Sequence, residues 1–298
     1  MEKAISKSTA KLMLFTAALI WGATFVITKN SLDDTQPFFL TAMRFSIGSL
    51  AMLPFLWKKR KLINRDMLIA GALIGFNLFA GFAAQAIGLL TTTPSKNAFL
   101  SSCYSALVPL LAWLLLRRKP DRWQAFAALL CIIGVGIISL EGDLSFRRGD
   151  VISFIAAIFY AGQFIALEKF GAGKDVYLIS MIEFGFAGLY AWILSFLTEG
   201  MPQFTGISPY SWFSIFYLGV LSSSVAFLFQ NVGQRYTDAA SSSLILSLEC
   251  VFGTIIAVLF YGDRLTLKLS IGFTVVFLAI LCSETKFAFL RKKGVSRP

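Results

Sequence analysis

Residues 82–92 read FAAQAIGLLTT, and residues 227–237 read FLFQNVGQRYT. At a shift of 145 residues, Gln85 pairs with Gln230 and Gly88 pairs with Gly233. Apolar matches are common between any two membrane segments, but matched glutamines are less so. Further matches at this shift are Leu73/Leu218, Phe82/Phe227, Thr92/Thr237, Ser102/Ser247, Ala112/Ala257 and Leu114/Leu259. The pattern predicts that the chain contains two copies of one unit.

The composition around these stretches indicates a membrane protein. Of 298 residues, 57% are hydrophobic and only 14% are charged, against roughly 45–50% and roughly 25% in soluble domains. The apolar residues occur in uncharged runs, several of them near or above the ~20 residues that span a hydrocarbon core. These runs exclude a soluble globular enzyme.

Apolar content and the charges between runs predict an all-α integral membrane protein with ten transmembrane helices. The expected spans are 12–29, 37–57, 67–90, 94–116, 122–140, 150–168, 175–197, 210–234, 238–260 and 266–285. The connections are short, so any chemistry has to take place within the membrane.

The distribution of Lys and Arg predicts the orientation of these spans. With a cytoplasmic N-terminus, 20 basic residues fall on the cytoplasmic side and 6 on the outer side, with Arg44 left inside a span. This bias places both termini in the cytoplasm, and residues 286–298 form a basic cytoplasmic tail. We expect the protein in the plasma (inner) membrane, in contact with its lipids.

The spans divide into two repeats of five, at residues 12–140 and 150–285. A second match, at a shift of 139, pairs Trp21 with Tyr160 near the start of each repeat. Because five is odd, the second copy enters the membrane from the opposite side, which gives an inverted-topology repeat. That architecture encloses a cavity near the midplane and is typical of secondary transport by alternating access.

Several other classes of function are disfavoured by the residues present. The chain has no histidine, which removes histidine-based catalysis and metal ligation. Its four cysteines are isolated, without the spacing of a zinc site or a disulfide framework. The net charge of +11 lies in short loops and reflects topology rather than nucleic-acid binding. Ser95 and Lys96 do not form the Ser-Lys pair of an intramembrane enzyme, because adjacent residues on a helix do not face one another. We therefore expect no enzyme, no cofactor and no metal site.

Three motifs resemble the EamA-like group of the drug/metabolite transporter superfamily, which has two five-helix units. They are LIWGATFVITK at residues 19–29, the stretch from Pro37 to Arg44, and LSLECVF at 246–252 leading to YGDRL at 261–265. The resemblance covers essentially the whole chain. It implies movement of small metabolites driven by protons or another gradient, often the export of amino acids and related compounds. Departures are Cys250 where a proline is usual and Arg117-Arg-Lys-Pro120 where a Gly-Glu-Arg type end is common.

Three charges fall inside predicted spans, where ionised side chains are unfavourable and invite a functional explanation. Glu249 lies 11 residues from each end of its predicted span, so it is expected near the midplane, where it binds substrate or a proton or pairs with another helix. Glu183 is expected either in a cavity as a proton site or in a structural pair. Arg44 could bind a substrate carboxylate, but a fixed ion pair or snorkelling to the interface is favoured.

Uncharged polar and aromatic residues supply further candidates for the cavity wall. Gln85 and Gln230 occupy matched positions and either orient a substrate or bond between helices. The remaining candidates are Tyr104, Asn97, Trp21 and Tyr160. Tyr104 matches Glu249 in the repeat, so that pair breaks the symmetry chemically.

The leading prediction is a secondary transporter that exports small zwitterionic or weakly amphipathic metabolites. Uptake or exchange is the main alternative, because the same repeat serves either direction. A channel or a membrane sensor would share the cavity without alternating. The residues leave open the substrate, the coupling ion and the oligomeric state.

Overall fold

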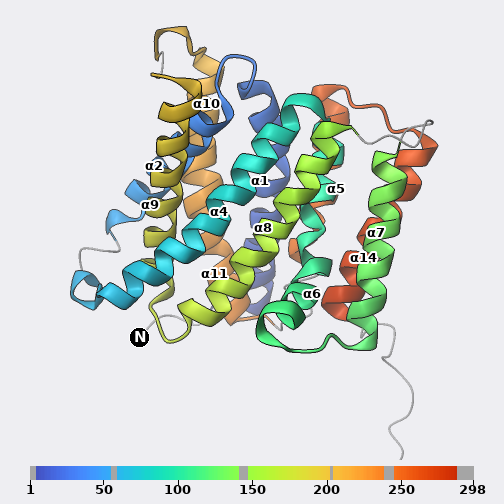
Figure 1. Ribbon diagram of the computed structural model, residues 1–298, viewed down its shortest axis with the longest axis horizontal. Coiled ribbons are helices and arrows are strands. Elements are labelled where there is room, and N and C mark those ends of the chain that lie inside the picture. The colour runs from blue at the N-terminus through green and yellow to red at the C-terminus, as the bar shows by residue number, and fades with distance from the viewer. Residues whose placement is uncertain (1–4, 55–58, 141–146, 202–203, 238–244, 287–298) are drawn as a thin grey trace, which may run out of the picture.

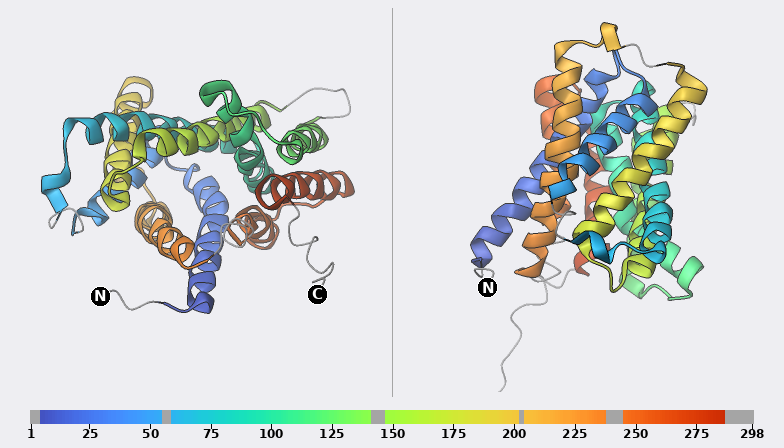
Figure 2. Two further views of the ribbon diagram at one scale, coloured as in Figure 1. Left: turned by 90° about the horizontal axis from the view of Figure 1, so that it is seen from below. Right: turned by 90° about the vertical axis from the view of Figure 1, so that its left-hand side faces the viewer.

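The computed structural model describes residues 5–54, 59–140, 147–201, 204–237 and 245–286. The regular elements within these ranges are helices, and they stand side by side in one bundle (Figure 1). The first turn of α1 (Lys7–Ser31) and the last turn of α14 (Leu267–Thr285) lie at the same, lower end of the bundle (Figure 1; Figure 2).

The main helices up to residue 140 are α1 (Lys7–Ser31), α2 (Pro37–Ala51), α4 (Arg65–Thr91), α5 (Pro94–Ser102), α6 (Tyr104–Leu116) and α7 (Arg122–Ser139). After residue 147 they are α8 (Arg148–Gly171), α9 (Val176–Leu194), α10 (Pro209–Phe216), α11 (Ala226–Arg235), α13 (Leu248–Ile256) and α14 (Leu267–Thr285). Three π-helical stretches continue these helices: η2 (Ser195–Glu199), η4 (Tyr217–Val225) and η5 (Ala257–Tyr261).

Eight helical segments among the described residues are long and apolar enough to cross a membrane. They coincide with all the predicted spans except the second and the ninth. The second is represented by α2, which has 15 residues, and the ninth by the shorter apolar helix Leu248–Tyr261. Residues 55–57 and 238–244 of those spans, and the tail from 287, lie outside the described residues. The count of ten therefore stays a prediction.

Helix starts are set by polar side chains that accept hydrogen bonds from the first free backbone N–H groups. Asn64 Oδ1 accepts from Met67 N at 2.8 Å at the start of α4. Asp121 and Gln124 form a reciprocal capping box at the start of α7. Asp175 accepts from Tyr177 N and Leu178 N at the start of α9. These caps lie between apolar runs, where the sequence predicted boundaries.

The predicted span 94–116 was expected to be one helix, but the structure divides it at Cys103 into α5 and α6.

Pro109 within α6 has no N–H to donate to the Ser105 carbonyl. Ser283 Oγ of α14 donates to that carbonyl instead, at 2.8 Å. The helix therefore keeps its backbone satisfied inside the bundle by a bond from a neighbouring helix, as a membrane interior requires.

The strongest packing joins the part of the chain before residue 140 to the part after residue 147. Helix α4 packs along α8 and α9, α7 along α14, α1 along α11 and α13, and α2 along α9 and η4. Figure 2 shows the pair α7 and α14 at one edge of the bundle. The two parts are thus interleaved, and residues from both face the interior.

Candidate functional site

A cavity of about 970 Å³ lies inside the bundle, lined by side chains from both parts of the chain. Its wall includes the exposed Glu168, Glu284 and Lys286, which belong to the end of the bundle where α8 and α14 finish. At its inner end it includes Arg44 and Glu183, which are 4% and 1% exposed. The cavity therefore opens at one end and reaches charged side chains in the interior.

Eight of the nine predicted candidates line this cavity: Glu249, Glu183, Arg44, Gln85, Gln230, Tyr104, Trp21 and Tyr160. Asn97 does not. Its Nδ2 donates to Gln85 O at 3.2 Å and to Ser153 Oγ at 2.7 Å, which ties α5 to α4 and α8. Asn97 therefore ties helices together and does not line this cavity.

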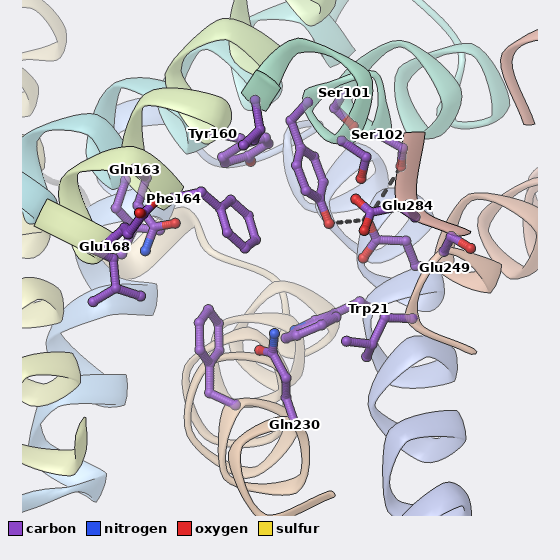
Figure 3. Close-up of a pocket in the computed structure, with 18 of the residues that line it drawn as sticks. Trp21, Ser101, Ser102, Tyr160, Gln163, Phe164, Glu168, Gln230, Glu249 and Glu284 are labelled. Atoms are coloured by element: carbon purple, nitrogen blue, oxygen red, sulfur yellow. Dashed lines mark hydrogen bonds between the residues drawn. The ribbon is translucent and has the colours of Figure 1, made fainter. Parts of the chain in front are cut away.

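Glu249 lies in the first turn of α13, because Ser247 interrupts the helix just before it. This differs from the expected position in the middle of a continuous helix. The first turn of a helix favours a negative side chain through its unpaired N–H groups and dipole. Ser102 Oγ donates to Glu249 Oε1 at 3.3 Å, and Tyr104 Oη donates to the same oxygen at 3.5 Å (Figure 3).

The two helix breaks occur at nearly equivalent places. Cys103 separates α5 from α6, and Ser247 precedes α13; the shift of 145 residues maps Cys103 onto the residue after Ser247. Tyr104 follows the first break directly and Glu249 lies two residues after the second, so both enter the cavity from the first turn of a helix. The two side chains meet there.

Aromatic rings form much of the remaining wall. Tyr160 Oη donates to Gln85 Oε1 at 2.7 Å, and Tyr104 stacks on Phe164 with ring centroids 5.1 Å apart. Trp21 Nε1 donates to Ser222 O at 2.9 Å. Figure 3 shows Tyr160 and Phe164 on one side of the cavity and Trp21 and Gln230 on the facing side. Aromatic side chains therefore line both sides of the cavity.

Glu183 enters the wall from α9. Its Oε2 accepts a long hydrogen bond of 3.5 Å from Gln163 Nε2, and Gln163 is itself buried. Figure 3 shows Gln163 and Glu249 on opposite sides of the cavity. The cavity thus carries two separate acidic positions.

Arg44 was expected in an ion pair or at the interface, and the structure has neither. Among the described residues no carboxylate lies within ion-pair distance of its guanidinium. Its Nε donates to Ser223 Oγ at 3.1 Å and its Nη2 to Ser222 Oγ at 2.8 Å. The guanidinium carbon lies 4.1 Å from the Phe82 ring centroid. Arg44 therefore points into the protein.

Several wall residues were not named as candidates by sequence reasoning, among them Ser102, Gln163 and Phe164. Ser102 had a signal, because it matches Ser247 in the repeat and both line the cavity. Gln163 also had one, since it matches Thr24 at a shift of 139 and both line the cavity. Phe164 had no distinguishing signal among 30 phenylalanines.

Ion pairs at the open end belong to the loops and helix ends. Arg118 pairs with Glu168 and Lys286 with Asp121. The hydrogen bond from Lys286 and the backbone N–H of Gln124 lower the pKa of Asp121. These pairs are partly exposed and contribute little to stability, so they do not hold the cavity shut.

Comparison with known proteins agrees with this architecture. The model of the EamA-like transporter family matches residues 8–140 and again residues 147–285. An uncharacterized transporter of Archaeoglobus fulgidus is 29% identical over 280 residues, which cover 93% of this chain and 86% of the relative. A biotin transporter of Escherichia coli is 22% identical over 258 residues, 82% of each chain.

A solved crystal structure has the same fold, with a TM-score of 0.63 at 19% identity over 96% of this chain and all of the other. The relatives are named as transporters, and the family model covers nearly the whole chain. The apolar helices make it a multi-pass membrane protein. The chain belongs to the EamA-like transporter family.

Proposed function

We propose that the protein is a secondary active transporter that moves amino acids or related small metabolites out of the cytoplasm by alternating access. The observation that carries the proposal is the cavity of about 970 Å³, open at one end, with the buried Glu183 and the half-buried Glu249 in its wall. Carboxylates inside a membrane bundle are unfavourable unless they bind something. Glu249 and Glu183 are the proposed sites for a coupling proton or for a substrate ammonium group.

The proposed architecture is two inverted five-helix repeats, residues 12–140 and 150–285. The two separate matches of the family model support it. The helix breaks at Cys103 and Ser247, which are almost equivalent under the repeat, support it as well. In this proposal Tyr104 and Glu249 meet close to the pseudo-two-fold axis.

The bundle is closed at the end opposite the cavity mouth by a buried polar cluster. Lys96 Nζ lies 2.8 Å from Asp150 Oδ2, and the side chains are 11% and 0% exposed. Thr92 donates to the other oxygen of Asp150. Ser95 N and Oγ donate to Asp263 Oδ2 at 3.0 and 2.5 Å. Alternating access requires these contacts among α4, α5, α8 and the segment between η5 and α14 to separate.

We propose that the cavity mouth faces the cytoplasm and that the closed cluster faces outward. The bias of 20 basic residues against 6 supports this orientation, because the mouth lies at the end assigned to the basic side. The arrangement then represents an inward-facing state in the plasma membrane.

The experiment that tests the function is efflux from proteoliposomes loaded with pooled labelled amino acids and related metabolites under an imposed pH gradient. Glu249→Gln is compared with Glu168→Gln, which removes an exposed carboxylate at the cavity mouth. Selective, gradient-dependent efflux that Glu249→Gln abolishes and Glu168→Gln retains supports the proposal. Efflux that is equal in both variants contradicts the role of Glu249, and no flux of any compound contradicts transport of this class.

A second candidate is uptake of a metabolite. An inverted repeat works in either direction, and the name of the relative called a biotin transporter gives no direction. The same proteoliposomes with the gradient reversed decide between the two directions.

A further inference from the structure

Arg44 is a buried cation without a buried anion. It lies halfway along α2 with 4% of its surface exposed, and it lines the cavity. Inside a membrane bundle a guanidinium is normally compensated by a carboxylate or by backbone carbonyls. Among the described residues its hydrogen bonds reach only the hydroxyls of Ser222 and Ser223, which are neutral.

The two hydroxyls are presented by the π-helical stretch η4, and π-helical turns are frequent at functional sites. Ser223 Oγ itself donates to Leu218 O, five residues earlier, at 3.0 Å. Gly219 permits the close approach of η4 to α2, because a Cβ there would lie 2.6 Å from Ile47 Cβ and 3.1 Å from Arg44 O. The guanidinium is thereby held in one orientation.

This arrangement leaves donors unused. A guanidinium has five N–H groups, and the hydrogen bonds to Ser222 and Ser223 use two of them. No other hydrogen bond of Arg44 occurs within the described residues. The Phe82 ring lies under the guanidinium carbon at 4.1 Å, and such stacking leaves the N–H groups at the rim of the plane available for a planar anion.

We propose that Arg44 is the carboxylate-binding residue of the cavity and that the transported compound carries a single carboxylate. The planar fork of a guanidinium matches the two oxygens of a carboxylate. A dianion such as phosphate fits less well, because Glu183 and Glu249 line the same cavity and repel excess negative charge. The bound carboxylate supplies the negative charge that no described residue places beside Arg44.

The surroundings specify the rest of such a compound. Phe82 contacts Arg44 and also contacts Tyr160, with ring centroids 5.1 Å apart. Tyr160 in turn lies 6.2 Å from Tyr104. A carboxylate on Arg44 therefore extends its body along aromatic rings, so the occupant is a small carboxylate with an apolar or aromatic body. This inference rests on the proposed transport function and adds the chemistry of the substrate.

The test uses four probes with one phenyl body and different head groups: 3-phenylpropanoate, phenylalanine, phenylalaninamide and phenethylamine. Binding to the purified full chain is measured at equilibrium by thermal stabilisation, since a ligand that binds the folded state raises its stability by mass action. We expect the two carboxylates to bind at least about tenfold more tightly than the amide and the amine, as for a charge-assisted hydrogen-bonded pair.

Variants of Arg44 and of its two serine partners test whether Arg44 causes the preference for carboxylates. Arg44→Gln abolishes the preference for carboxylates, whereas Arg44→Lys keeps the charge but loses the fork, so it retains a reduced preference. The double variant Ser222→Ala with Ser223→Ala keeps the guanidinium and is the second test if Arg44→Gln does not fold; it weakens carboxylate binding several-fold. Arg118→Gln serves as the matched control, because this arginine is exposed and does not line the cavity, and it leaves the preference unchanged.

Three results overturn the proposal. The first is equal binding of acid and amide, and the second is no binding of either carboxylate. The third is a preference for acids that survives Arg44→Gln or, where that variant does not fold, survives the double serine substitution. Because binding is measured without a gradient, it is separate from flux. Carboxylate binding without flux keeps Arg44 in this role and removes the transporter proposal. Flux of amines without a preference for carboxylates supports the transport function and contradicts the carboxylate-binding role of Arg44.

Discussion

Tyr104 Oη lies 3.5 Å from Glu249 Oε1, and the two residues are separated by 145 positions, the same shift that pairs Gln85 with Gln230. A tyrosine and a glutamate at positions matched by that shift thus contact each other inside the cavity. Only one of the two can ionise within the physiological range. The contact therefore places one acidic side chain beside a phenol, each in the first turn of a helix.

We expect Tyr104→Phe to reduce gradient-dependent flux by less than Glu249→Gln, because the phenol orients the carboxylate and Ser102 still donates to it. The double variant Tyr104→Phe with Glu249→Gln is expected to be no worse than Glu249→Gln alone, since residues in one network are not additive. Initial rates in proteoliposomes measure this cycle. Additive losses would mean that Tyr104 acts independently of Glu249.

We expect Glu183→Gln to leave the thermal stability unchanged or higher while gradient-dependent flux falls. The side chain is 1% exposed and its hydrogen bond to Gln163 is 3.5 Å long, so the folded state gains little from the charge. Unfolding in detergent and flux are measured on the same preparation. Gln163→Ala, which removes the hydrogen-bond donor to Glu183, is measured beside it. If Glu183→Gln loses stability but keeps its flux per folded molecule, the carboxylate has a structural role and no role in transport.

The buried pair Lys96–Asp150 is expected to stabilise the closed end. Asp150→Asn leaves Lys96 uncompensated and is expected to destabilise the protein by about 3–5 kcal/mol, seen as a lower Tm. Lys59→Met breaks the partly exposed pair with Asp175 and is expected to cost at most about 1 kcal/mol. The double variant Lys96→Met with Asp150→Asn should recover part of the loss. Equal effects at the two pairs would contradict a special role of the closed end.

Gly22 is expected to be essential for the packing of α1 on α13. A Cβ at this position would lie 2.6 Å from Phe252 Cβ and 2.9 Å from Gly253 N. Gly22→Ala is therefore expected to destabilise the protein by about 1–3 kcal/mol, as overpacking does. Gly136→Ala is the matched control, because its nearest neighbour would be Leu140 Cδ1 at 3.8 Å. The two variants are compared by Tm, and a tolerated Gly22→Ala would show that the two helices can separate.

Asp175 is expected to make stability depend on pH at the acidic end. Although burial opposes ionisation, hydrogen bonds from Lys59, Leu178 and Tyr177 lower the pKa of Asp175. Because its pKa is lower in the folded state, its contribution is present above the unfolded value of about 4 and is lost as the pH falls below it.

The comparison of Asp175→Asn with Asp175→Ala separates charge from capping. Asparagine still caps α9, whereas alanine is expected to cost about a further 1 kcal/mol. The Tm difference between wild type and Asp175→Asn should shrink as the pH falls through 4, and the difference between the two variants should persist. If the Tm difference between wild type and Asp175→Asn does not depend on pH, the ionised carboxylate of Asp175 is not the cause of that difference.

Long apolar segments and their boundaries were predictable from local sequence. Burial of about 20 consecutive apolar residues in lipid depends on composition alone, and the predicted spans 67–90 and 150–168 match the helices Arg65–Thr91 and Arg148–Gly171 within a few residues. The matched glutamines Gln85 and Gln230 also pointed to residues that line one cavity. Those signals need no knowledge of which helix lies beside which.

The rotation and pairing of the helices could not be read from composition, because almost every face of these helices is apolar. Asn97 and Gln163 are both buried amides, yet only Gln163 lines the cavity, because α5 and α8 turn those faces differently. Arg44 lacks a counter-charge for the same reason: packing of α2 on η4 presents two serine hydroxyls to it instead of a carboxylate. Local hydrophobicity thus specified the segments, and long-range packing between helices far apart in the chain set the chemistry of the interior.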